Sequence, residues 1–212
     1  MTTSTSIPLD STNGYEVYFR GKLTGNNSTS NYTRFTMTGD NVYVLGDIMN
    51  LYNYENLGTT ISYNYAFTRL FLDCKKLYHV GNILPATTLS SHCYDGMFWG
   101  CNFLTSAPEL PATTLASGCY YNMFSECNNL ASAPVLTAAT LKQDCYAYMF
   151  NNCYLVDEIT MLATNISASG CLTGWVSGVA ASGTFYKDSG MSSLSTGTSG
   201  IPSGWTVLDY AG

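Results

Sequence analysis

The 212-residue chain combines an apolar interior with a surface that carries few charges. Hydrophobic residues make up 46% of it and charged residues 10%, so Ser, Thr, Asn, Gly and Tyr must cover most of the surface. The chain contains eight Lys and Arg residues and 14 Asp and Glu residues. This excess of negative charge disfavours binding to nucleic acid or to an anionic membrane. No apolar run reaches the length of about 18 residues that a membrane span needs, and we expect no membrane insertion.

The first 60 residues show no internal repeat. Residues 1–14 lack the basic and apolar regions of a secretory signal, and we expect them to form a flexible tail. Residues 15–60 are predicted to be a β-rich N-terminal cap, because two stretches alternate like strands around a polar turn. These stretches are YEVYFRGKLTG and TRFTMTGDNVYVLG.

Self-similarity at a spacing of 26 residues dominates the middle of the chain. Two cysteine series recur at this interval, and a Met-Phe pair lies between them in each copy. The series are Cys93, Cys119, Cys145, Cys171 and Cys101, Cys127, Cys153. An earlier, degenerate copy contains Cys74. Repeats of this length indicate stacked units that bury a common core. We assign residues 61–175 to this array and residues 176–212 to a C-terminal cap with two short strands.

Each unit is predicted to be a strand, a turn and a short helix. The stretch LTSAPEL resembles a short strand, with Pro108 placed where no ladder bond is needed. In CYYNMFSEC, the residues Cys119, Met123 and Cys127 stand at i, i+4 and i+8, the spacing of one helix face. The predicted fold is therefore an α/β repeat solenoid, a leucine-rich-repeat-like stack of about 26-residue units with a β cap at each end.

A family resemblance follows from the run LPATTLSSHCYDGMFWGCNFLTSAPELPATTLASGCYYNMFSEC. It is similar to the BspA-type leucine-rich repeats, whose unit has an aromatic residue, Gly-Cys, a Leu-containing strand and a Pro turn. The matching residues are Phe98-Trp99-Gly100-Cys101, Leu104 and Leu110-Pro111. The resemblance covers about residues 40–212. Such repeats are common in surface proteins of Bacteroides and in phages or prophages of such hosts, so the resemblance implies a solenoid that serves in adhesion or recognition.

The eight cysteines suggest packing before they suggest chemistry. Paired cysteines eight residues apart would lie about 12 Å apart along a helix, which is too far for a disulfide. No short Cys spacing typical of zinc ligands occurs, and we expect no metal site and no cofactor. Buried columns of free cysteines are the favoured interpretation. Bridges between neighbouring units are the alternative.

Catalysis is not expected. Histidine occurs twice, at His79 and His92, and adjacency to Cys93 alone does not make a catalytic pair. The acidic residues fall at different positions in different copies, against a shared carboxylate pair. The Met-Phe pairs are expected to pack in the core.

Aromatic residues beside the core positions are the candidate ligand contacts. Exposed aromatics one unit apart suit sugar stacking or a protein contact. The candidates are Tyr94, Trp99, Tyr120, Tyr121, Tyr146, Tyr148 and Tyr154. The expected function is a non-catalytic module that binds a glycan or protein on a cell surface, as a bacterial adhesin or a phage tail or head-fibre component. The absence of a signal favours the virion. The alternative is a structural spacer or virion decoration subunit that oligomerises through its capping regions.

Overall fold

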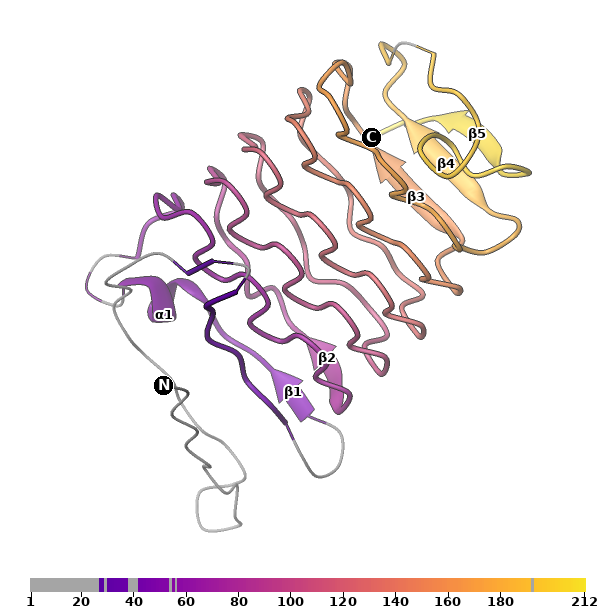
Figure 1. Cartoon of the computed structure of the whole chain (residues 1–212). Coiled ribbons are helices and arrows are strands. Elements are labelled where there is room, and N and C mark those ends of the chain that lie inside the picture. The colour runs from indigo at the N-terminus through magenta and orange to yellow at the C-terminus, as the bar shows by residue number, and fades with distance from the viewer. Residues whose placement is uncertain (1–26, 29, 38–41, 54, 56, 192) are drawn as a thin grey trace.

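The computed structural model describes residues 27–28, 30–37, 42–53, 55, 57–191 and 193–212. The predicted flexible tail, 1–14, and the first predicted strand, 15–25, lie outside the described residues. The elements in chain order are β1 (Val42–Val44), α1 (Met49–Asn53), β2 (Leu77–Val80), β3 (Glu158–Met161), β4 (Thr184–Lys187) and β5 (Thr206–Asp209) (Figure 1). No helix in this described part is long and apolar enough to cross a membrane.

The predicted α/β repeat solenoid is wrong. Within the described residues α1 is the one helix, five residues long, and it lies before the region where the short helices were expected. The parallel strands form two small separate sheets, β1-β2 and β3-β4-β5, and no continuous sheet. Of the predicted terminal strands, β4 and β5 are present. In the second predicted N-terminal stretch, 33–46, β1 forms at Val42–Val44, whereas residues 33–37 form no strand.

Tight turns occupy the place of the predicted helices. Five segments, which we call turn segments 1 to 5, lie side by side across the molecule (Figure 1): residues 65–73, 92–100, 118–126, 144–152 and 170–178. In each segment every fourth residue has a left-handed backbone, as at His92, Gly96 and Gly100. A right-handed helix cannot continue through such residues. The stripe at i, i+4 and i+8 therefore comes from a four-residue turn period, which is close to the 3.6-residue helical period.

Backbone hydrogen bonds alternate between two directions along each turn segment. In segment 2, every second N–H donates to the carbonyl three residues back, for example Met97 to Tyr94 at 3.1 Å. The remaining N–H groups donate to carbonyls of segment 3, for example Phe98 to Met123 at 3.0 Å. Segments 1, 3 and 4 follow the same rule. Buried backbone is thus satisfied without helix or sheet.

Prolines explain why the strands stay short. Where LTSAPEL was predicted to be a strand, only a single bridge forms, between Ser106 and Ser132. Pro108 and Pro134 stand two residues after these two serines and lack the backbone N–H that a further ladder hydrogen bond would need. At the equivalent place, 26 residues after Pro134, stands Thr160, and here strand β3 forms.

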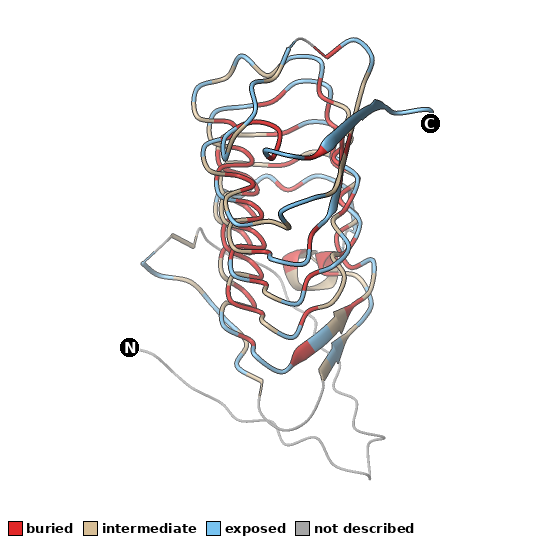
Figure 2. Ribbon diagram, turned by 90° about the vertical axis from the view of Figure 1, so that its right-hand side faces the viewer, coloured by how far each residue is buried: buried red, intermediate tan, exposed pale blue. Residues whose placement is uncertain are grey.

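The core consists of columns of identical side chains. Phe71, Phe98, Phe124 and Phe150 stack with ring centroids 5.5, 5.7 and 5.9 Å apart and nearly parallel planes. Trp175 follows Phe150 at the end of the column, with the two ring centroids 6.3 Å apart. Figure 2 shows buried residues recurring at the same place in successive segments. Offset stacking lets large rings repeat at the backbone spacing without collision.

All eight cysteines are free and buried. This is the interpretation that the sequence favoured, and the alternative of disulfides between neighbouring units is not observed. One series forms a ladder of thiol hydrogen bonds. The thiols of Cys101, Cys127 and Cys153 donate to the carbonyls of Phe71, Phe98 and Phe124, at 3.0, 3.1 and 3.0 Å. Each of these cysteines directly follows a turn segment and bonds to a carbonyl of the preceding segment, so the thiols tie neighbouring segments together.

Different groups close the two ends of the stack. At the first segment, Asn27 Nδ2 donates to the Ala66 carbonyl at 3.1 Å, and the Phe35 N–H donates to Leu70 at 2.7 Å. At the last segment, Val176 N–H donates to the Thr198 carbonyl at 3.2 Å, and Trp175 Nε1 donates to Gly200 at 2.8 Å.

Candidate functional site

The left-handed positions place their side chains at the surface of the turn segments. None of the nine non-glycine residues with positive φ is buried. Six of them lean over a glycine of the next segment, and a Cβ on that glycine would lie within 3.3 Å of the covering side chain. The closest such contacts would be 2.3 Å at Gly118, under the His92 ring, and 2.0 Å at Gly170, under Asp144. Surface side chains are therefore held in one direction.

Four ring side chains run across segments 1 to 4, and we call Tyr65, His92, Tyr121 and Tyr148 the aromatic strip. Tyr65 stacks on His92 with centroids 4.9 Å apart and planes 9° apart. Tyr121 lies 6.4 Å from His92 and meets Tyr148 edge-on at 5.7 Å. Tyr148 is 37% exposed. The strip thus presents rings and polar ring atoms along a row one segment apart.

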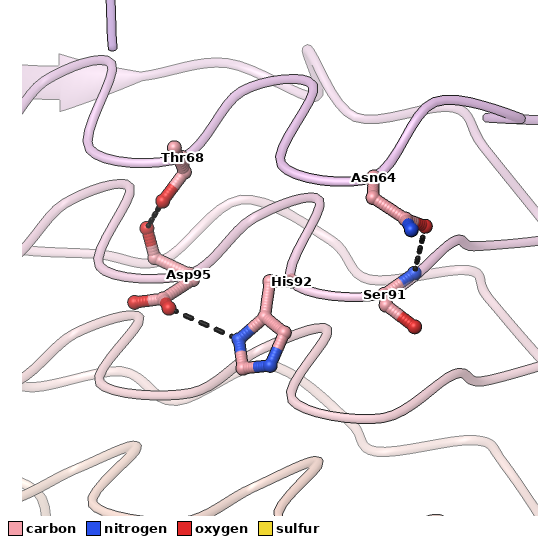
Figure 3. Close-up of polar contacts among 5 residues, drawn as sticks. All are labelled: Asn64, Thr68, Ser91, His92 and Asp95. Carbon is pink, nitrogen blue, oxygen red and sulfur yellow. Dashed lines mark hydrogen bonds and ion pairs between the residues drawn. The ribbon is translucent and has the colours of Figure 1, made fainter. Parts of the chain in front are cut away.

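Polar contacts fix the centre of the strip (Figure 3). His92 Nδ1 lies 3.1 Å from Asp95 Oδ2, and Asp95 is buried. The Asp95 carbonyl accepts the Thr68 hydroxyl at 3.0 Å, which ties segment 2 to segment 1. Beside them, Asn64 Oδ1 accepts the Ser91 N–H at 3.2 Å. The imidazole is therefore held between Tyr65 and Gly118, with Nδ1 committed to Asp95.

The hydroxyl of Tyr121 stays protonated over a wide pH range. Burial raises its pKa, and the neighbouring Tyr148 and Asp95 raise it further. The hydroxyl can therefore donate a hydrogen bond to a ligand.

The predicted contact residues fall into four groups. Tyr94, Tyr120 and Tyr146 are buried and stack on one another at 5.8 and 6.0 Å, so a ligand cannot reach them. Trp99 is partly buried beside the Arg69 guanidinium, 5.9 Å from its ring. The structure brings Tyr121 and Tyr148 together in the aromatic strip and leaves Tyr154 apart from it, exposed by 54%.

Two residues of the strip, Tyr65 and His92, were not among the candidate contacts predicted from the sequence. A signal was present, because tyrosine at every unit spacing marks a core column, as at Tyr94, Tyr120 and Tyr146. Equivalent positions that hold glycine in one segment and a large side chain in the next mark the surface instead. His92 and Gly118 stand in such a series.

The thiols are poor candidates for chemistry. Burial raises the pKa of Cys93 to about 12 and that of Cys153 to about 12. Burial also raises the pKa of Cys74 to about 11. A thiol reacts as its thiolate, so these groups are inert near neutral pH.

Other site types find little support in the described residues. No group of three or more His, Cys, Asp or Glu side chains there could hold a metal ion. A pocket of about 370 Å³ lies between α1 and residues 58–63. Its Tyr52 hydroxyl accepts the Ser62 and Tyr63 N–H groups at 2.7 and 3.3 Å, and so holds residues 62–63 in place. The aromatic strip is therefore the candidate site.

Comparison with known proteins adds no assignment. No family model matches the chain, and neither a curated protein nor a solved structure matches it.

Proposed function

We propose that this protein is a non-catalytic recognition module whose aromatic strip contacts a glycan or protein on a cell surface. The observation that carries the proposal is the row of ring side chains on successive turn segments, fixed by His92–Asp95 and open at Tyr148. Rings with polar edges supply contact area and hydrogen bonds at low entropic cost.

The chemistry around the strip favours binding over catalysis. The contact with Asp95 orients the imidazole of His92 but places no nucleophile beside it, since the nearby Thr68 hydroxyl donates to a backbone carbonyl. The thiols, which react as thiolates, are buried with raised pKa values. The rigid row that remains is suited to positioning a ligand.

The ligand we propose is weakly charged. The strip itself consists of tyrosines and one imidazole, and charged residues are scarce in the whole chain. Binding through such groups changes little with salt, unlike binding between opposite charges. The proposed setting is a bacterial cell surface or a virion. Membership of the BspA-type family stays a proposal based on sequence motifs.

A panel of immobilised neutral and acidic oligosaccharides tests the function. We expect selective binding that persists at physiological salt and falls about 5- to 30-fold in Tyr148→Ala, since one well-packed aromatic contact contributes about 1–2 kcal/mol. Tyr78→Ala is the matched control, because Tyr78 is equally exposed, 37%, but lies on β2 outside the strip.

Two outcomes would count against the proposal. Equal loss in Tyr148→Ala and Tyr78→Ala would place the ligand elsewhere. No binding to any oligosaccharide or surface protein would favour the second candidate, a structural spacer. The observation behind that candidate is the closed network of backbone and thiol bonds between segments.

A further inference from the structure

The C-terminal sheet ends in an uncovered strand. In the order β3-β4-β5, strand β5 has β4 on one side and no described strand on the other. All four residues Thr206–Asp209 are exposed. Exposed strand edges are templates for pairing with another chain unless proline, charged side chains, a bulge or a very short strand protects them. Neither proline nor lysine occurs in β5, and its pairing with β4 is regular.

The open edge has a defined set of backbone groups. Thr206 and Tyr210 donate their N–H groups to Gly183 and Lys187, at 2.9 and 2.7 Å. Strand residues alternate in direction, so Val207 and Asp209 direct their N–H and C=O groups away from β4. The edge therefore offers two donors and two acceptors.

In one arrangement, the edge donors and acceptors of one chain pair with the same groups of a second chain. If a second β5 lies antiparallel with Leu208 on the two-fold axis, Val207 of each chain faces Asp209 of the other as a doubly hydrogen-bonded pair. Leu208 then faces its own copy as a close, non-hydrogen-bonded pair, with Cα atoms about 4.5 Å apart. Its side chain, 46% exposed in the single chain, becomes covered.

Charge is compatible with this pairing. The only charged side chain of β5, Asp209, is bonded to Lys187 of β4 at 2.6 Å. Two copies would thus bring together two neutralised pairs and no uncompensated charge. On the same face, Val207 continues the column of Ile159 and Phe185, both buried, but is itself 40% exposed. A neighbouring strand would cover this end of the core.

We propose that β5 is a homodimerisation edge, on which a second copy of the chain pairs antiparallel with its two-fold axis at Leu208. The interface is isologous, so assembly stops at two chains. It is independent of any ligand on the aromatic strip.

Solution mass is the first measurement. With any tag placed at the N-terminus, light scattering should show the mass rise from 23.0 kDa towards twice that value as concentration rises from about 1 to 500 µM, the range for a small interface. Leu208→Asp and Leu208→Lys should each stay monomeric. An equimolar mixture of the two should restore the doubled mass, because opposite charges then meet at the axis.

Crosslinking locates the axis directly. A Cα separation of about 4.5 Å permits a disulfide, so Leu208→Cys should give a covalent dimer under mild oxidation. Leu155→Cys is the matched control, since Leu155 is 50% exposed on the loop after segment 4. Circular dichroism checks that each variant is folded. A wild-type mass of one chain at every concentration, or equal crosslinking at both cysteines, would overturn the proposal.

Discussion

Replacing Gly118 by alanine tests how the surface side chains are held. Gly118 has φ of +59°, and an added Cβ would lie 2.3 Å from Cε1 of His92. The left-handed backbone costs alanine about 1 kcal/mol. Moving the imidazole also forfeits its stacking on Tyr65, about 1 kcal/mol, and its hydrogen bond to Asp95, about 1 kcal/mol. We expect the free energy of unfolding to fall by about 3 kcal/mol.

A double-mutant cycle separates the backbone cost from the ring contact. The urea midpoint is measured for Gly118→Ala, for His92→Gly and for the two combined. Without the imidazole, Gly118→Ala should cost only the backbone term, about 1 kcal/mol. In thermal melts the difference corresponds to about 2–4 °C per kcal/mol for a chain of this size. Equal costs in both backgrounds would refute the reasoning, because the ring would then contribute nothing.

Two further predictions concern the core. Phe124→Ala removes a ring stacked on both sides and should lower the free energy of unfolding by about 3–5 kcal/mol in urea, whereas Tyr154→Ala should change it by less than about 0.5 kcal/mol; similar effects would contradict the column. Burial raises the pKa of Cys93 to about 12, above its ordinary value of about 8.5, so the folded state holds this proton more tightly. Stability should be full below pH 8.5 and fall by about 1.4 kcal/mol per pH unit for each such thiol up to the raised pKa. Circular dichroism against pH measures this, and a stability unchanged from pH 8 to 10.5 would contradict it.

The sequence located the recurring positions but not their backbone conformation. The Cys and Met-Phe series occupy equivalent places in the core, as their spacing indicated. Their four-residue interval was interpreted as a helix, because 4 is close to 3.6 and the apolar stripe looks alike in both cases. Gly96 and Gly100 carried the missing information, since two glycines four residues apart are costly within a helix.

The candidate site was predicted in part for a related reason. Tyr121 and Tyr148 are at the surface, but Tyr94 and its equivalents are in the core. Tyrosine has a large apolar ring with a polar tip, so composition cannot decide whether it faces inward. The recurrence of tyrosine at the 26-residue spacing, as at Tyr94, Tyr120 and Tyr146, would have identified the tyrosines that face inward. The hydrogen bond of His92 to Asp95 depends on the turn geometry, which the sequence pattern did not reveal.

The direction of the bonds between segments has a consequence for how such a molecule can change in length. Every such backbone bond from segments 1 to 4 runs from an N–H to a carbonyl of the following segment, so one end of the stack needs donors and the other needs acceptors. The Phe35 N–H supplies a donor at the first end, and the Thr198 carbonyl supplies an acceptor at the second. A donor and an acceptor cannot exchange these roles. Duplication or deletion of a whole unit between them preserves every bond type, whereas a break inside a unit does not. The number of stacked segments can therefore change by whole units, while the residues that close the two ends of the stack stay the same.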